Sequence, residues 1–203
     1  RPMVEIWVPI TVVAALFQTL RTALQKQLNV ELSINATTFA RYVYGFPLAA
    51  LYVGGLVVFA GFDLPVVNAT FLRFCLIGGI AQIIATSALI GLFRLRSFAV
   101  GTTFSKTEAI QAALFGTLIL GESVSTGGIA AIFVSLLGVL LLSWAANTGS
   151  TIGLLRNLGG RAVFLGLLSG ALFGVSAVSI RAASLSLGLD HFAIRAGMTV
   201  ATM

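Results

Sequence analysis

The chain has 203 residues, of which 58% are hydrophobic and only 9% are charged. Soluble domains carry about one quarter charged residues, so this composition excludes an ordinary soluble protein and indicates an integral membrane protein surrounded by a lipid bilayer. The formal net charge of +6 does not indicate a nucleic-acid partner, because the basic residues are scattered among apolar segments and form no basic run.

Six apolar runs are long enough to cross a bilayer, which takes about twenty mostly apolar residues. In chain order these runs are 6–27, 36–60, 70–93, 98–120, 125–145 and 162–184, and a seventh begins near Asp190. Because backbone polar groups find no water in lipid, helices are expected throughout these runs. The predicted fold class is therefore all-α, an integral membrane protein that forms a polytopic helix bundle.

Polar residues form stripes within the first two runs. Gln18, Arg21 and Gln25 recur at intervals of three and four residues, which places them on one face of a helix. Arg41 and Tyr44, three residues apart, share a face in the second run. These faces are expected to line an internal space, although Arg21 could instead extend towards the membrane interface.

The fourth run contains the segment "TFSKTEAIQ", with Lys106, Glu108 and Gln111 among apolar neighbours. An isolated charge at the bilayer centre costs about 3 kcal/mol on insertion scales, so such residues normally face a cavity or a partner. Lys106 and Glu108 lie about 200° apart around a regular helix and cannot pair directly. They are expected either to line a cavity or to form links between helices.

The expected inward set has more positive than negative charge, which favours an anion or the carboxylate of a zwitterion as ligand. Glu108 is the only carboxylate expected deep within a span, so it is the candidate carrier if transport is driven by protons. The predicted lining of the substrate cavity is Arg21, Gln25, Arg41, Tyr44, Lys106, Glu108 and Gln111.

Other residues are assigned structural roles. Gly166, Gly170 and Gly174 recur every four residues and predict a ridge that lets two helices pack closely. Gly121 and Glu122 form the expected turn before the fifth run, where a carboxylate complements the N-terminal end of the following helix.

Catalytic and cofactor chemistry find no support in the sequence. The single cysteine, Cys75, cannot form an intrachain disulfide and is interpreted as a buried packing residue. No nucleophile with an acid or base partner and no metal-ligand pattern is recognisable, so neither enzymatic activity nor a cofactor or metal is predicted.

A similarity between two parts of the sequence divides the chain into residues 1–148 and 149–203. The segment "ALF" at residues 15–17 recurs at residues 171–173, and Arg41 then falls close to Arg195 if about two residues are dropped. A copy that follows five spans enters the membrane from the opposite face, which makes the two repeats inverted. Chance similarity between two helices rich in Ala, Leu and Gly is the alternative.

Three segments resemble the EamA-type proteins of the drug/metabolite transporter superfamily. They are "PITVVAALFQTLRTALQKQL", "TTFARYVYGFPLA" and "RSFAVGTTFSKTEAIQAALFGTLILGESVSTGGIAAIFVSLLGVLLL". The resemblance implies ten helices in two inverted five-helix repeats, a central cavity and location in the plasma membrane, here the inner membrane of a bacterium. It also implies that this chain is truncated in the second repeat.

The sequence therefore predicts a secondary-active transporter that exports a small organic metabolite or drug by alternating access. Its expected partners are the lipid bilayer and a small-molecule solute, while coupling to protons or another ion and homodimerisation stay open. A membrane scaffold or assembly protein is the alternative, because it would need the packing glycines but no buried bases. An intramembrane enzyme is a more remote alternative.

Overall fold

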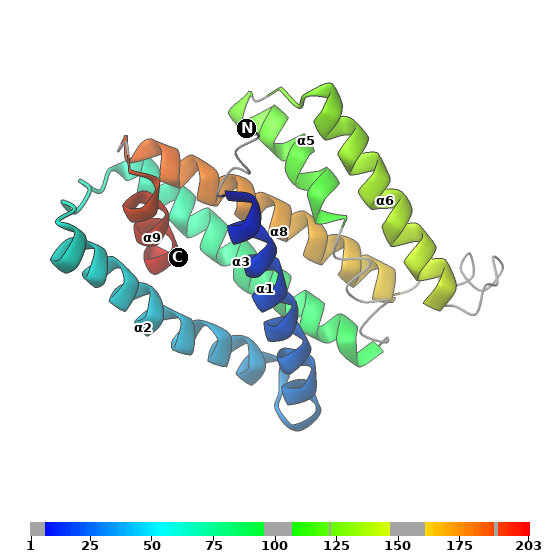
Figure 1. The fold of residues 1–203 in the computed structure, drawn as a ribbon. Coiled ribbons are helices and arrows are strands. Elements are labelled where there is room, and N and C mark those ends of the chain that lie inside the picture. The colour runs from blue at the N-terminus through cyan, green and yellow to red at the C-terminus, as the bar shows by residue number, and fades with distance from the viewer. Residues whose placement is uncertain (1–6, 96–106, 122, 147–160, 189–190) are drawn as a thin grey trace.

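The computed structural model describes residues 7–95, 107–121, 123–146, 161–188 and 191–203 (Figure 1). Every regular element in these ranges is a helix. The helices are α1 (Trp7–Glu31), α2 (Ile34–Ala60), α3 (Ala69–Leu95), α5 (Glu108–Leu120), α6 (Thr126–Ala146), α8 (Arg161–Ser186) and α9 (Phe192–Thr202). The predicted all-helical fold is confirmed.

The helices follow the predicted apolar runs closely, and the fourth run is described from residue 107 onwards. Among the described residues, three helices are long and apolar enough to cross a membrane, namely Ile34–Ala60, Ala69–Leu95 and Ala162–Ser186. This finding supports a membrane helix bundle. The full number of spans and the inverted repeats stay predictions.

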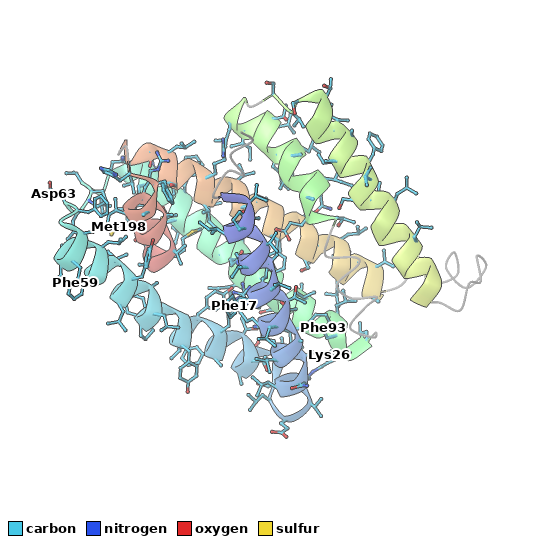
Figure 2. The ribbon with its side chains drawn as sticks, in the orientation of Figure 1. Phe17, Lys26, Phe59, Asp63, Phe93 and Met198 are labelled. Atoms are coloured by element: carbon cyan, nitrogen blue, oxygen red, sulfur yellow. The ribbon has the colours of Figure 1, made fainter. Side chains whose placement is uncertain are left out.

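Large apolar side chains cover the outside of the bundle. Phe17 on α1 is 68% exposed and Phe59 on α2 is 90% exposed (both labelled in Figure 2). Soluble proteins rarely leave so much contiguous apolar surface in water. The exposed apolar surface, like the composition, is that of a membrane protein whose outer surface contacts lipid.

Small residues bring α3 and α8 together in the middle of the bundle (Figure 1). Gly78 on α3 lies so close to α8 that a Cβ atom there would be 2.9 Å from the Cβ of Ser179. Further along the pair, the Ser169 hydroxyl donates a hydrogen bond of 3.0 Å to the backbone oxygen of Ala85. Close backbone approach through small residues is the usual way in which helices associate in lipid.

Asn68 fixes one end of this central pair. Its side-chain oxygen accepts a hydrogen bond of 2.7 Å from the backbone N–H of Phe71, which caps the start of α3. Its side-chain nitrogen donates a hydrogen bond of 2.6 Å to the backbone oxygen of Ser186 at the end of α8. Next to this link, Cys75 lies buried in an apolar cluster with Ala183 and Leu187, in agreement with its predicted packing role.

The glycines of α8 face α5 on the other side of the central pair. A Cβ atom at Gly170 would lie 3.1 Å from the side-chain oxygen of Gln111, and one at Gly174 would lie 3.0 Å from the backbone nitrogen of Ala112. Gly166 is also buried on α8. Figure 1 shows α6 at the outer edge of the bundle.

The remaining helices lie on the opposite side of α3. α2 begins at Ser33, whose hydroxyl accepts a hydrogen bond from the backbone N–H of Ala36, and it ends at Gly61 in the left-handed conformation with φ of 67°. α9 lies between α2 and α8, where Gly197 packs against the ring of Tyr52 (Figure 1). Beyond α9, part of α2 faces α3 directly.

Gly174→Leu should lower the free energy of unfolding by about 1–3 kcal/mol, because the new side chain has no space between α8 and α5. Gly138→Leu on α6 is the matched control, since a Cβ atom there would meet no atom within 4 Å. Thermal unfolding of the purified protein in detergent, followed by circular dichroism, measures both. Equal midpoints for the two variants would contradict the close packing of α5 on α8.

Cysteines at the two ends of α2 should react from opposite sides of the membrane. Leu32→Cys lies before α2 and Val66→Cys lies after it, both at exposed positions, and the native Cys75 is replaced by Ala. A membrane-impermeant maleimide applied to intact cells should modify only one of the two. If both cysteines react from the same side, α2 does not cross the membrane.

Candidate functional site

A hydroxyl group on α3 holds the Arg41 side chain of α2. The guanidinium Nη1 donates a hydrogen bond of 2.9 Å to Oγ1 of Thr86, which is fully buried. Thr86 itself donates to the backbone oxygen of Gln82 at 2.8 Å. A hydroxyl group has only one proton, so the 3.1 Å contact between Tyr42 and Thr86 must be a bond that Tyr42 donates.

Tyr42 also contacts the guanidinium through its ring. The central carbon of the Arg41 guanidinium lies 5.5 Å from the ring centroid, within the range of a cation–π interaction. Thr86 and Tyr42 together therefore fix the position of the Arg41 charge. Both partners are neutral, so the positive charge of Arg41 is not compensated by them.

A cavity of about 460 Å³ lies beside Arg41, between α1, α2, α3, α8 and α9. It is lined by Arg21, Arg41, Tyr42, Gly45, Phe46, Gly79, Gln82, Ser176, Ile180, Val200, Ala201, Thr202 and Met203. None of these residues is Asp or Glu. Arg41 is partly buried and Arg21 is exposed. Their guanidinium groups lie close enough to repel each other, and neither forms an ion pair with a described residue.

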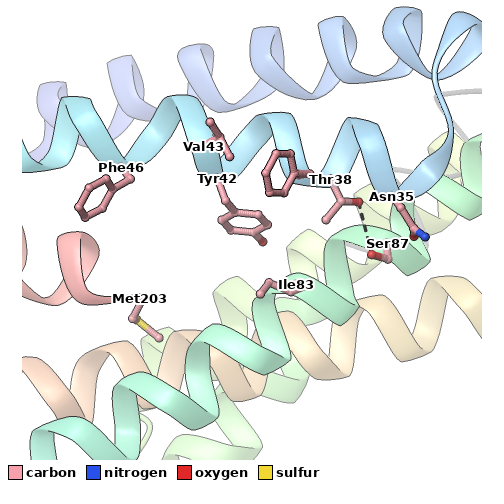
Figure 3. Close-up of a pocket in the computed structure, with 9 residues that line it drawn as sticks. Asn35, Thr38, Tyr42, Val43, Phe46, Ile83, Ser87 and Met203 are labelled. Atoms are coloured by element: carbon pink, nitrogen blue, oxygen red, sulfur yellow. Dashed lines mark hydrogen bonds between the residues drawn. The ribbon is translucent and has the colours of Figure 1, made fainter.

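A second hollow of about 640 Å³ adjoins this cavity and forms a groove between α2 and α3 (Figure 3). It is lined by Asn35, Thr38, Phe39, Tyr42, Val43, Phe46, Ile83, Ser87 and Met203. Three of these residues, Tyr42, Phe46 and Met203, also line the cavity. At the far end, the hydroxyl groups of Thr38 and Ser87 form a hydrogen bond of 3.3 Å.

Of the residues predicted to line one cavity, the structure brings Arg21 and Arg41 together. Gln25 lies one turn further along α1 from Arg21, where it is buried and its Nε2 has no hydrogen-bond partner among the described residues. Tyr44 is 75% exposed and lines neither hollow, because it lies about 200° around α2 from Tyr42, which points towards α3.

The predicted residues of α5 lie in a different place. Glu108 is the first residue of α5, and its backbone nitrogen lies beside Gly170 of α8. The side-chain oxygen of Gln111 is buried against the same glycine and has no hydrogen-bond partner among the described residues. Neither residue lines the cavity around Arg41. Lys106 lies outside the described residues.

The predicted turn after α5 is described only in part. Gly121 ends α5 in the left-handed conformation with φ of 67°, and its N–H bonds to carbonyl oxygens of the last helical turn. Glycine adopts this conformation without steric cost, which explains the residue at this position. Glu122 lies outside the described residues. Within the described ranges, no group of three or more His, Cys, Asp or Glu side chains could hold a metal ion.

Three residues of the site escaped the sequence interpretation, namely Tyr42, Thr86 and Ser176. Gln82 and Thr86 are four residues apart in an otherwise apolar run, so their shared polar face could have been found. Ser176 carries no comparable signal, because serine is common wherever membrane helices pack closely.

Comparisons with known proteins found no match to the chain. No family model matches the chain, no curated protein matches it, and no solved structure matches it. The resemblance to EamA-type proteins therefore stays a prediction, and the site is interpreted from its own geometry.

Thr86→Val should lower the free energy of unfolding by about 1–2 kcal/mol, because it leaves the partly buried Arg41 guanidinium without its hydroxyl acceptor. Thr199→Val is the matched control, since Thr199 is also fully buried but bonds only to the backbone oxygen of Arg195 in its own helix. Chemical unfolding in mixed micelles measures both variants. If Thr86→Val in an Arg41→Met background costs as much as in the wild-type protein, the two side chains are not coupled.

Proposed function

We propose that this chain binds a small organic anion in the cavity beside Arg41 and moves it across the plasma membrane as a secondary-active transporter. The observation that carries the proposal is the pair of guanidinium groups, Arg21 and Arg41, in a cavity whose described lining contains no acidic side chain. Two repelling cations among apolar helices are costly, and an anion bound between them would offset that cost.

The size of the cavity fits this proposal. Its volume of about 460 Å³ is within the range of sites that bind small organic molecules, about 300–1,000 Å³. An inorganic anion would fill only part of this space. The apolar side chains of Phe46, Ile180 and Val200 would contact the rest of the ligand.

The way in which α2 packs favours movement during transport. Most of its apolar surface is exposed, while α3 and α8 are about half buried. Pro47 lies inside α2, six residues after Arg41, and removes one backbone hydrogen bond of the helix. A helix with few contacts and a weakened point can change its position relative to the central pair, as alternating access requires.

The resemblance to EamA-type exporters points to the same class of function and favours export of a metabolite or drug. Coupling to protons through Glu108 is a separate hypothesis, since Glu108 lies beside α8 and outside the cavity lining. A scaffold protein would use the packing of α8 against α3 and α5 but would have no use for two unpaired arginines.

Arg41→Gln should reduce the flux of organic anions at least tenfold, because the charge-assisted contact it removes contributes about 1.5–3 kcal/mol. Arg73→Gln is the matched control, since Arg73 is exposed on α3 and lines no described hollow. The measurement is uptake of labelled monocarboxylates and organic phosphates into liposomes that contain the full chain. Transport of tetraethylammonium that does not depend on Arg41 would refute the proposal.

A further inference from the structure

We infer that the ligand is an amphiphilic organic anion, with its charged group between Arg21, Arg41 and Ser176 and its apolar body in the groove between α2 and α3. This inference rests on the proposed function, because it assigns the substrate class of the same site. To the two arginines of the proposed site it adds Ser176 as a third polar contact. It also adds the groove as a second part of the binding site.

Ser176 is the first observation that points to a bound ligand. It lines the cavity, it is fully buried, and its Oγ has no hydrogen-bond partner among the described residues. Hydroxyl groups in membrane helices normally donate to the carbonyl four residues earlier, as those of Thr86 and Thr199 do here. A buried hydroxyl without a partner is unfavourable, and a ligand oxygen in the cavity would accept its hydrogen bond.

The groove is the second observation. Tyr42, Phe46 and Met203 line both hollows, so the groove continues directly from the cavity that holds the two arginines. Beyond these shared residues its walls are the apolar side chains of Val43 and Ile83 (Figure 3). A molecule that extends from one hollow into the other meets cations first and hydrocarbon next.

The two ends of the groove limit the length of the ligand. Phe46 adjoins the cavity, and the polar far end is formed by Asn35, Thr38 and Ser87 (Figure 3). Eleven residues of helix separate Phe46 from Asn35, a distance of about 16 Å along the axis of α2. A short hydrocarbon body fits this length, whereas the acyl chain of a membrane phospholipid would extend past it.

Binding of straight-chain carboxylates of increasing length tests this assignment. The full chain in nanodiscs of phosphatidylcholine is equilibrated with labelled butanoate, hexanoate or octanoate, and partition into empty nanodiscs is subtracted. Affinity should rise about tenfold for every two methylenes that enter the groove. Neutral octanol and cationic octylammonium should bind at least tenfold more weakly than octanoate, because they gain nothing from the two arginines.

Two pairs of variants separate the compartments. Ser176→Ala should weaken octanoate about fivefold, whereas Ser179→Ala, also buried on α8 but outside the cavity lining, should leave it unchanged. Val43→Trp fills the groove and should reduce octanoate affinity to that of butanoate. Leu48→Trp is the control, because Leu48 is exposed on α2 and lines neither hollow. If Val43→Trp does not fold, Ile83→Trp replaces it.

Three binding results would overturn the inference. One is equal affinity for butanoate and octanoate, and another is octanoate binding that Val43→Trp and Ile83→Trp leave unchanged. The third is competitive displacement of octanoate by phosphatidylglycerol in the nanodisc, which would make a membrane lipid the occupant.

Anion flux without dependence on chain length would overturn the inference and keep the proposed transport. Binding that depends on both charge and chain length, without flux, would keep the inference and refute transport.

Discussion

Close contact between α3 and α8 is the constraint on which the other helix positions depend. Lipid is as apolar as the helix surfaces, so no hydrophobic force brings membrane helices together, and they associate through close packing and hydrogen bonds. Gly78 allows the two backbones to approach, and the bond from Ser169 to the backbone of Ala85 holds them in register. Asn68 adds a link at the end of the pair.

The remaining helices pack on the surfaces of α3 and α8 that the contact between these two helices leaves accessible. The glycines of α8 accept α5 on one side, and on the other side α9 occupies the space next to α2. Beyond α9, α2 is held mainly by polar contacts from Thr38, Arg41 and Tyr42 to α3. The cavity and the groove lie where that contact is polar and incomplete, so the same feature that positions α2 also creates the candidate site.

The helices themselves could be predicted from the sequence because few backbone conformations are stable in lipid. A long apolar run must satisfy its own backbone hydrogen bonds, and the helix does so, which is why predicted and observed bounds agree closely. The glycine spacing on α8 likewise indicated a packing face. The spacing of residues in the sequence predicts the face of the helix on which a residue lies. It does not predict which neighbouring helix that face contacts. The Gln111 side chain and the backbone of Glu108 therefore lie against α8, and neither residue lines the cavity of Arg41.

Two features of the site depend on tertiary packing and could not be read from spacing. Tyr42 and Tyr44 flank the same segment of α2, and only the direction from which α3 packs decides that Tyr42 contacts Arg41. Ser176 is one of several serines on α8. Its spacing does not show that it lines a cavity or that its hydroxyl has no hydrogen-bond partner among the described residues. Both residues became recognisable once neighbouring helices were placed.

The choice of a hydroxyl as the partner of Arg41 has a chemical consequence. A carboxylate at the position of Thr86 would neutralise the guanidinium and take two of its donors in a bidentate pair. Thr86 accepts only one hydrogen bond from Arg41, and a guanidinium has five N–H donors, so Arg41 keeps both its charge and most of its donors. With Arg21 beside it, this geometry positions the charge without neutralising it, which is the arrangement that reversible binding of an anion requires.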